Sequence, residues 1–250
     1  MSTKGFRINV LLMFLLFVAS GFVGRAVAQE TWEFDAAIYA WVPNIDVELP
    51  TGQKSKITRN DILENLDFTF MGRFFARRNN WSVGTDFLYF DLSHKGDDPI
   101  GRFLELREIE LQSYLITPSV GYRVLESENG WTETFAGVRF LSLETSLEIR
   151  TVDPLPPESN KDSETDQRWD GILGVRGVYN LGERWFIPYS ADVGTGESDY
   201  VYSLFGGIGY RFGGVDAVAG WRYMDYDFGD NWVLKTMTIN GPLVGVAFSF

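Results

Sequence analysis

The chain has 250 residues but no cysteine and only one histidine. Without cysteine it has no disulfides, no thiolate metal ligands and no thiol nucleophile. Positive charge is also scarce, since 22 Lys and Arg stand against 34 Asp and Glu, for a formal net charge of −12. A chain this acidic is poorly suited to the nucleic-acid backbone, so no nucleic-acid partner is expected.

Long apolar runs are lacking beyond the first residues, and the mean hydropathy of −0.09 is too low for a helical membrane protein. A positive start, an apolar run and a small-residue site follow one another at Lys4 and Arg7, at 10–18, and at Ala26-Val27-Ala28. This order predicts a signal peptide over residues 1–28, with Gln29 first in the mature chain. An uncleaved anchor is the alternative, because 8–23 nearly reaches the length of a membrane span. Cleavage leaves 19 basic and 34 acidic residues, a net charge of −15.

Apolar residues alternate with small or polar ones along most of the mature chain, which is typical of strands. In the last stretch, 236–250, one face carries Val244, Val246, Phe248 and Phe250. Ten such segments are predicted, at 32–42, 68–77, 81–92, 106–124, 131–149, 169–179, 185–193, 200–212, 215–226 and 236–250. An even strand count brings the last strand beside the first.

The predicted fold is an all-β, closed antiparallel up-and-down transmembrane β-barrel of about ten strands over 29–250, with eight or twelve strands as alternatives. Aromatic residues make up 16% of the chain, and two girdles at the membrane interfaces would account for them. A soluble β-sandwich also has many short strands. It is disfavoured because Gly and charged residues occupy the face where a sandwich needs its core.

The connections alternate in length, and short turns follow every second strand. Within the first long connection, 45–49 and 54–57 are expected to pair as a hairpin, and Asn60 is expected to cap a short helix over 61–64. Polar composition predicts loops at 94–102 and 151–167. Two details of the strands are predicted as well: a bulge at Pro118 and a lipid-facing Tyr89.

Short motifs are spread along the chain: Tyr39-Ala-Trp-Val-Pro43, Asp61-Ile-Leu-Glu-Asn-Leu-Asp-Phe68, Val120-Gly-Tyr-Arg123, Gly137-Val-Arg-Phe140, Gly174-Val-Arg-Gly-Val-Tyr179, Gly209-Tyr-Arg-Phe212, Gly220-Trp-Arg-Tyr223 and Gly241-Pro-Leu-Val-Gly245. Together they resemble a family of small, largely uncharacterised proteobacterial outer-membrane β-barrel proteins. The resemblance implies the fold and the outer membrane, and no reaction. The final strand also resembles the ending that the barrel-assembly machinery reads, with Phe248 and Phe250 as the assembly signal.

Charged residues of both signs fall on the predicted lumen face, where Gly and Arg stand two residues apart. The predicted lumen charge network is Asp35, Arg73, Asp86, Glu133, Arg139, Asp170, Arg176, Asp192, Arg211 and Arg222. Paired, these groups would form an interior plug of hydrogen-bonded ion pairs, with Gly leaving room for the guanidinium groups. Unpaired, they would line a path selective for an anion or a small polar solute. The plug is favoured, because buried ions persist when they are paired.

Other chemistry has weaker support. His94 stands beside Asp91 and Ser93, but alternate residues of one strand diverge, and a triad needs side chains that converge. Acidic runs at 97–98 and 162–166 offer oxygen ligands for a divalent cation, although the spacing of a calcium loop is missing. No catalytic residue, metal or cofactor is therefore predicted.

The expected function is that of a non-enzymatic outer-membrane barrel with a structural role or a role in binding or passing a small solute. The alternative is a barrel enzyme, a hydrolase or transferase directed at lipid or peptide, at the extracellular rim. Expected partners are outer-membrane lipid, lipopolysaccharide and the barrel-assembly machinery.

Overall fold

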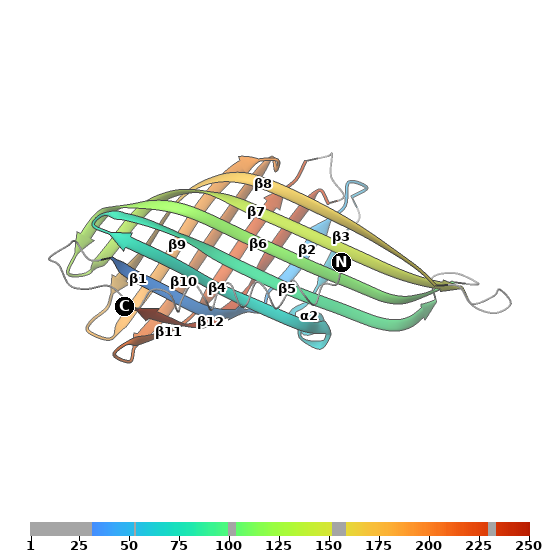
Figure 1. The fold of residues 1–250 in the computed structure, drawn as a ribbon, viewed down its shortest axis with the longest axis horizontal. Helices are drawn as coiled ribbons and strands as arrows, with labels where there is room; N and C mark the ends of the chain where they lie inside the picture. The colour runs from blue at the N-terminus through green and yellow to red at the C-terminus, as the bar shows by residue number, and fades with distance from the viewer. Residues whose placement is uncertain (1–31, 53, 100–103, 152–158, 230–233) are drawn as a thin grey trace. The chain divides into compact units, whose positions relative to one another are not determined.

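The computed structural model describes residues 32–52, 54–99, 104–151, 159–229 and 234–250. The predicted signal segment lies outside these residues. Ten strands form the barrel (Figure 1): β1 (Glu33–Trp41), β4 (Leu66–Arg78), β5 (Trp81–Pro99), β6 (Leu104–Ser127), β7 (Gly130–Thr151), β8 (Ser159–Asn180), β9 (Trp185–Gly196), β10 (Tyr200–Arg211), β11 (Val215–Asp227) and β12 (Thr236–Ser249). Each pairs antiparallel with the next, and β12 closes on β1. The prediction of a closed ten-stranded antiparallel barrel is confirmed.

The barrel closes where β1 pairs with β12, from Asp35 opposite Ser249 to Trp41 opposite Leu243, and this pairing is called the seam. Along the seam neither strand has a free edge. Phe250 extends it, because its backbone N–H donates to the carbonyl of Phe34 at 3.0 Å and its carbonyl accepts from the Phe34 N–H at 2.8 Å. Closing a sheet in this way satisfies backbone groups that an open edge would leave unpaired.

Side chains alternate between the two faces of the wall, as the sequence predicts. In β1 the side chain of Ile38 is 54% exposed on the outside, whereas Ala37 and Trp41 are buried inside. The same period places Val138 outside and Arg139 inside on β7. The charged and glycine-rich face is therefore the lumen, and the apolar face is the outer surface.

The first long connection returns to the sheet. Strands β2 (Asn44–Glu48) and β3 (Lys54–Ile57) form the predicted hairpin, with Ile45 opposite Ile57. Strand β2 also pairs with β12, where Thr236 lies opposite Glu48. Pro43 separates β1 from β2, so the two act as one interrupted strand beside β12.

The helix α2 (Arg59–Asn65) follows this hairpin, and the predicted cap at Asn60 is wrong. Thr58 precedes the helix, and its hydroxyl accepts from the N–H of Asp61 at 3.4 Å. In return, the Asp61 carboxylate accepts from the Thr58 N–H at 2.8 Å and from the Thr58 hydroxyl at 2.7 Å, a reciprocal cap. These hydrogen bonds lower the pKa of Asp61 below its usual value. The helix is anchored by Ile62, which is buried in the lumen cluster.

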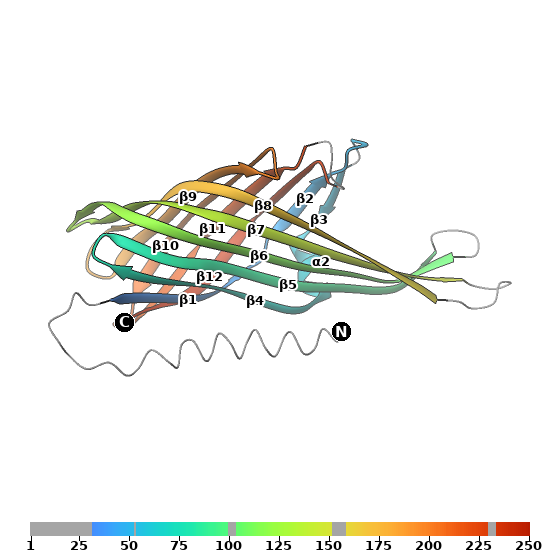
Figure 2. The same cartoon turned by 45° about the horizontal axis from the view of Figure 1, so that its top comes forward.

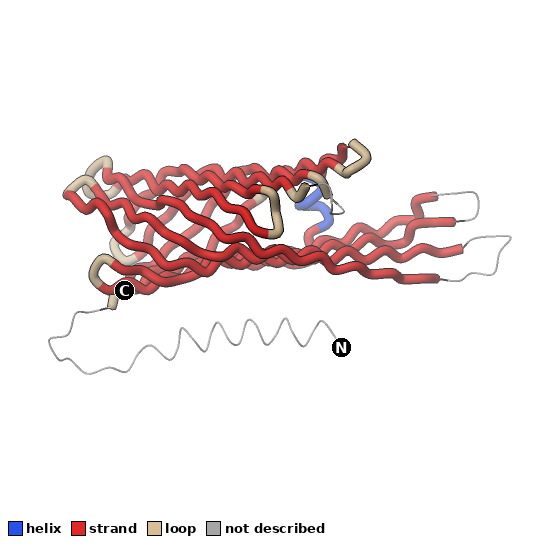
Figure 3. The backbone as a smooth tube through the Cα atoms, turned by 90° about the horizontal axis from the view of Figure 1, so that it is seen from above, coloured by secondary structure: helices blue, strands red, loops and turns tan. Residues whose placement is uncertain are grey.

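Four strands are longer than predicted, and two predicted loops are wrong in part. Strand β5 continues through His94 to Pro99, and β8 already begins at Ser159. Beyond the pairs Leu66–Leu92 and Asp170–Gly196, strands β5 to β8 pair only with one another, as an extension visible in Figures 2 and 3. Polar residues continue as strand there because backbone hydrogen bonds to neighbouring strands do not require apolar side chains. Strand β7 likewise continues to Thr151.

One further detail of the prediction is wrong. No bulge occurs at Pro118, because the register between β6 and β7 is the same at Ile116–Phe140 and at Ser119–Gly137. Tyr89 holds an outward position of β5, in the same alternation as Val83, although its side chain is buried. Its ring packs 4.8 Å from that of Tyr114, and its hydroxyl donates to the Asp91 carboxylate at 3.3 Å.

The wall carries aromatic pairs near both ends of the barrel. At the end with the short turns, Trp185 packs edge-on against Tyr210, with ring centroids 4.8 Å apart. Towards the other end, Phe140 and Trp169 approach to 4.4 Å. Within the part of the chain that the structure describes, no helix has the length and apolar character to cross a membrane.

Candidate functional site

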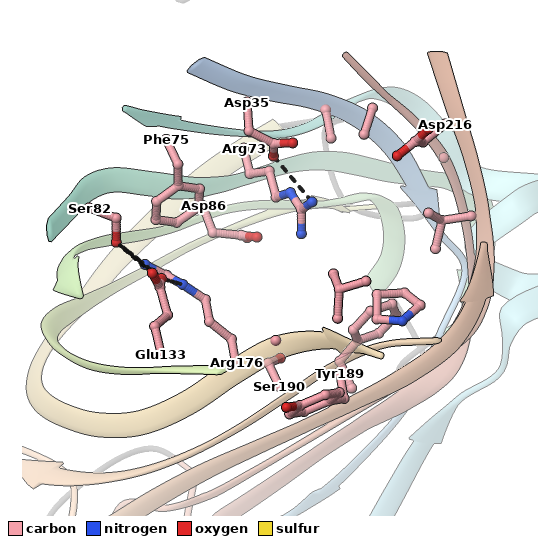
Figure 4. Close-up of a pocket in the computed structure, with 18 of the residues that line it drawn as sticks. Asp35, Arg73, Phe75, Ser82, Asp86, Glu133, Arg176, Tyr189, Ser190 and Asp216 are labelled. Carbon is pink, nitrogen blue, oxygen red and sulfur yellow. Dashed lines mark hydrogen bonds and ion pairs between the residues drawn. The ribbon is translucent and has the colours of Figure 1, made fainter. Parts of the chain in front are cut away.

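The barrel encloses a cavity of about 590 Å³, and all ten barrel strands contribute to its wall. Its lining residues lie towards the short-turn end, where the charged residues of the lumen gather (Figure 4). Volumes of this size are usual for pockets that bind small molecules. The cavity is therefore the candidate functional site.

Two ion pairs lie at the mouth of the cavity. Arg73 approaches Asp35 at 3.2 Å, and Arg77 is paired with Glu33. These groups are accessible, since the side chain of Glu33 is 64% exposed and that of Arg73 is 39% exposed. The exposure marks this end as the opening.

The next layer is organised around Arg176, which is paired with Glu133. Ser82 donates to both oxygens of that carboxylate at 3.0 Å, and Arg176 donates to the hydroxyls of Ser119 and Ser82 at 3.1 and 3.3 Å. The guanidinium of Arg176 also lies over the ring of Phe75, 4.0 Å from its centroid. Its charge is thus balanced, and its position is fixed from several sides.

A second cluster joins three strands at mid-height. The hydroxyl of Tyr39 donates to Asp86 at 2.7 Å, and Arg222 reaches the same carboxylate at 3.4 Å. Arg222 also donates to the Tyr39 hydroxyl at 3.3 Å. The carboxylate of Asp86 on β5 thus connects β5 to β1 and to β11.

The deepest ion pair joins Arg139 to Asp192, with 2.9 Å between Nη1 and Oδ1. Both side chains are buried, at 2% and 6% exposure. Gly174 on the intervening strand makes room for the pair, because a Cβ there would lie 2.7 Å from Cβ of Asp192. The atoms nearest to that Cβ belong to Ala191, Asp192 and Phe135, so the idea that lumen glycines make room for guanidinium groups stays a prediction.

Two predicted network residues have other partners. Asp170 accepts from the N–H and hydroxyl of Ser198 at 2.8 and 2.9 Å and so holds the connection between β9 and β10. Arg211 donates to the side chain of Asn180 at 2.8 Å and lies over the ring of Phe186 at 4.6 Å. The remaining eight predicted residues form four ion pairs: Arg73–Asp35, Arg176–Glu133, Arg222–Asp86 and Arg139–Asp192.

Apolar side chains fill the other half of the lumen, a feature that sequence reasoning missed. Seventeen described residues form one buried cluster, the lumen cluster: Trp41, Ile45, Ile62, Met71, Leu88, Leu92, Leu115, Phe135, Leu141, Ile172, Val201, Met224, Tyr226, Phe228, Met237, Ile239 and Leu243. Most of them occupy inward positions of strand segments towards the long hairpins. The signal was present in the sequence, because Met224 and Tyr226 continue the inward face of Arg222. Phe135 and Leu243 belong both to this cluster and to the cavity wall, so the lumen cluster borders the cavity.

Comparison with solved structures finds outer-membrane β-barrels that superimpose on this chain with low TM-scores. No family model and no curated protein matches the chain. The outer-membrane protease OmpT from Escherichia coli superimposes with a TM-score of 0.44 and 11% identity, over 91% of this chain and 99% of that one. The translocator domain of the autotransporter NalP from Neisseria meningitidis gives 0.41 and 14%, over 98% and 96%, and Ail from Yersinia pestis gives 0.38 and 11%, over 89% and 100%. At this level of similarity the resemblance to a proteobacterial barrel family stays a prediction.

Several polar atoms of the lumen are buried without a hydrogen-bond partner. They include Nε of Arg73, Arg123 and Arg139 and the hydroxyl of Thr117, all in residues that line the cavity. Buried donors are rarely left without an acceptor in folded proteins. Nη1 of Arg139 and Oδ1 of Asp192 are likewise buried without a hydrogen-bond partner, so their contact at 2.9 Å is an ion pair without hydrogen-bond geometry.

The structure does not describe enough side chains to test the predicted alternatives, a triad at Asp91, Ser93 and His94 and a cation site at the acidic runs 97–98 and 162–166. Asp91 is 2% exposed, and the side chains of Ser93, His94, Asp97 and Asp98 lie outside the described part, as do those of Asp162 and Glu164. Among the described residues, no three His, Asp or Glu side chains are grouped as metal ligands.

Proposed function

We propose that this protein is a non-enzymatic outer-membrane barrel that is closed to ion passage and holds a solute-binding pocket open at the short-turn end. In the topology expected for this fold, that end faces the periplasm. One observation carries the proposal: the cavity with its charged side chains borders the lumen cluster, whose buried apolar side chains lie towards the other end of the barrel. Such a barrel receives a small solute from one side and does not pass it through.

The membrane location is supported by the outer surface of the wall. Large apolar side chains there are half exposed or more on several strands, for example Ile38 at 54%, Leu173 at 64% and Val244 at 57%. A soluble protein rarely leaves so continuous an apolar surface in water. In lipid the same surface is solvated, and the closed sheet leaves no backbone edge unpaired.

The absence of catalysis is part of the proposal, and it rests on sequence spacing. Asp91, Ser93 and His94 are neighbours on one strand, β5, where alternate side chains diverge, whereas a triad needs three side chains that converge.

Reconstitution in planar bilayers tests whether the barrel is closed. We expect no sustained single-channel current. Open-channel conductance in the unmodified protein would refute a closed barrel.

Cysteine labelling in lipid nanodiscs tests whether the pocket is open, because the chain has no native cysteine to interfere. Ser190→Cys, in the wall of the cavity, is expected to react with a small charged methanethiosulfonate. Met224→Cys, in the lumen cluster, is the matched control and should stay unreacted, since Met224 is fully buried. An unreactive Ser190→Cys would show that the pocket is closed to solutes.

Location is tested separately, by fractionation and intact-mass measurement. The protein is expected with the outer membrane and with a mass that begins at Gln29. A mass that retains residues 1–28 would refute signal cleavage.

A further inference from the structure

We infer that the outer wall of the barrel at β10, β11 and β12 binds the headgroup of a phosphorylated glycolipid from the outer leaflet of the membrane. The side chain that holds the phosphate is Arg59, the first residue of α2. This inference rests on the membrane location in the proposed function, and it does not use the lumen pocket.

The first argument is a boundary on the outer wall, at the end with the long connections. On β11 the outward side chains change from apolar to polar between Trp221 and Tyr223. The register sets Trp221 opposite Pro242 and Tyr223 opposite Asn240, so β12 makes the same change at the same height. Asn44 of β2 lies opposite Asn240 and continues the polar row. The apolar band therefore ends here, and lipid headgroups of the outer leaflet lie at this height.

Arg59 reaches this boundary from the connection that precedes α2. Its guanidinium lies over the ring of Trp221, 5.8 Å from the centroid. Its backbone N–H donates to the side chain of Asn44 at 3.0 Å, which holds the start of the helix against the wall. An arginine over a tryptophan at the edge of the apolar band places its charge among the headgroups.

The charge of Arg59 is not balanced by the protein, since it forms no ion pair with any residue in the described part of the chain. The two carboxylates of β2 are paired with the lysines of β3, Asp46 with Lys56 at 3.3 Å and Glu48 with Lys54 at 3.2 Å. A guanidinium binds a phosphate group through two parallel hydrogen bonds. A lipid phosphate thus supplies the partner that Arg59 lacks.

The second argument is the aromatic surface further from the apolar band, which suits sugar rings. Tyr200, Tyr202 and Tyr223 stack in a row, with successive ring centroids 6.2 and 5.7 Å apart. Beside them the carboxylate of Asp225 accepts from the hydroxyls of Tyr223 and Thr238 at 3.2 and 2.6 Å. Aromatic faces pack against the C–H face of a sugar, and a carboxylate accepts from its hydroxyls.

The order of the charges fixes the orientation of the headgroup. Asp225 and Asp227 follow Tyr223 along β11, so both acids lie further from the apolar band than Arg59 does. They would repel a phosphate at their own height. The phosphate must therefore lie at Arg59, next to the acyl chains, with the sugar extending outward over the tyrosines. A phospholipid without a sugar would use Arg59 alone.

The experiment compares three lipids on the mature chain, by native mass spectrometry in a detergent without sugar groups. They are an acylated glucosamine disaccharide with two phosphates, the same glycolipid without phosphate, and phosphatidylglycerol. We expect the phosphorylated glycolipid to bind at least tenfold more tightly than each of the other two. No binding of this lipid, or equal binding of all three, would overturn the inference. Equal binding of phosphatidylglycerol would refute the sugar contact, and equal binding of the dephosphorylated glycolipid would refute the phosphate at Arg59.

Arg59→Gln assigns the phosphate site. Glutamine is a good helix former and keeps the backbone N–H, and no ion pair is lost, so folding is not at risk. The affinity for the phosphorylated glycolipid should fall about tenfold, the usual effect of one hydrogen bond to a charged group. Arg78→Gln is the matched control, because Arg78 lies 6.0 Å from the ring of Trp32 at the short-turn end. It should change nothing. Equal effects of the two variants, or none from Arg59→Gln, would contradict the placement.

Tyr202→Leu tests the sugar contact. This change removes one ring of the stack and leaves Arg59 in place. The affinity for the phosphorylated glycolipid should fall about fivefold, as for the loss of one aromatic contact, while that for phosphatidylglycerol stays unchanged. A loss for both lipids, or for neither, would contradict a sugar over the tyrosines.

The two proposals fail separately. If the protein fractionates with the outer membrane and Ser190→Cys is labelled, yet the phosphorylated glycolipid is not preferred, the proposed function stands and the glycolipid surface is wrong. If the protein is absent from the outer membrane, the proposed function itself is wrong.

Discussion

The ion pair between Arg139 and Asp192 gives the sharpest test of how the lumen is stabilised. Both side chains are almost fully buried, and the two charged atoms lie 2.9 Å apart. Arg139→Met removes one charge and nearly keeps the volume, so it leaves Asp192 as an uncompensated buried carboxylate. Breaking such a pair costs about 3–5 kcal/mol. We therefore expect the free energy of unfolding to fall by that amount.

The double-mutant cycle separates this effect from lost packing. Asp192→Leu alone should be similarly destabilising, because it leaves Arg139 unpaired. The double variant Arg139→Met with Asp192→Leu carries no stranded charge. It should recover about 2–3 kcal/mol relative to the sum of the single changes.

A matched pair at the mouth serves as control. Arg77 and Glu33 are also an ion pair, but the side chain of Glu33 is 64% exposed. Arg77→Met should therefore cost no more than about 1 kcal/mol, and the coupling in its cycle with Glu33→Leu should be equally small.

The assay is reversible urea unfolding in lipid vesicles, followed by the fluorescence of the eight tryptophans. Additive effects of Arg139→Met and Asp192→Leu would refute the reasoning, because they would mean that water compensates each charge separately. Equal coupling at the mouth and at the deep end would show that burial does not set the energy of these pairs.

Three further predictions concern other parts of the barrel. Replacing Leu88 and Met224 together by Ala should open the lumen cluster, so that planar-bilayer recordings show current, at a stability cost of at least about 2 kcal/mol; a folded variant without current would contradict the cluster as the barrier. Deleting Phe250, whose ring stacks 5.7 Å from that of Phe34, should lower the assembled yield on heat-modifiability gels far more than the stability of assembled barrels; an unchanged yield would contradict its role as an assembly signal. The lowered pKa of Asp61 means that its hydrogen bonds stabilise the start of α2 above the ordinary carboxyl pKa and cease to do so as the pH falls through the lowered value. Asp61→Asn should therefore speed amide exchange in α2 at neutral pH and have no effect in strong acid; an effect that persists in acid would refute the cap.

Much of the fold could be predicted because a strand in a barrel wall has two distinct faces. Residues with period two, such as Ile38 outside and Ala37 inside, record that division directly in the sequence. The hairpin of β2 and β3 was predictable for the same kind of local reason, since two short alternating runs flank a turn. The predicted loop at 151–167 was partly wrong because composition does not reveal a neighbouring strand. Polar residues from Ser159 onwards form β8 because β7 is available to pair with them.

The sequence by itself determined which residues face the lumen, and only the tertiary structure decided what they meet there. Arg176 and Asp170 share a strand face and the right charges, yet Arg176 is paired with Glu133 and Asp170 binds Ser198. Inward direction follows from the two-residue period of each strand, which is local. Partners depend on the stagger between strands and on side chains that reach across the lumen, as Arg139 does to Asp192 past Gly174, and the closure of the sheet sets both.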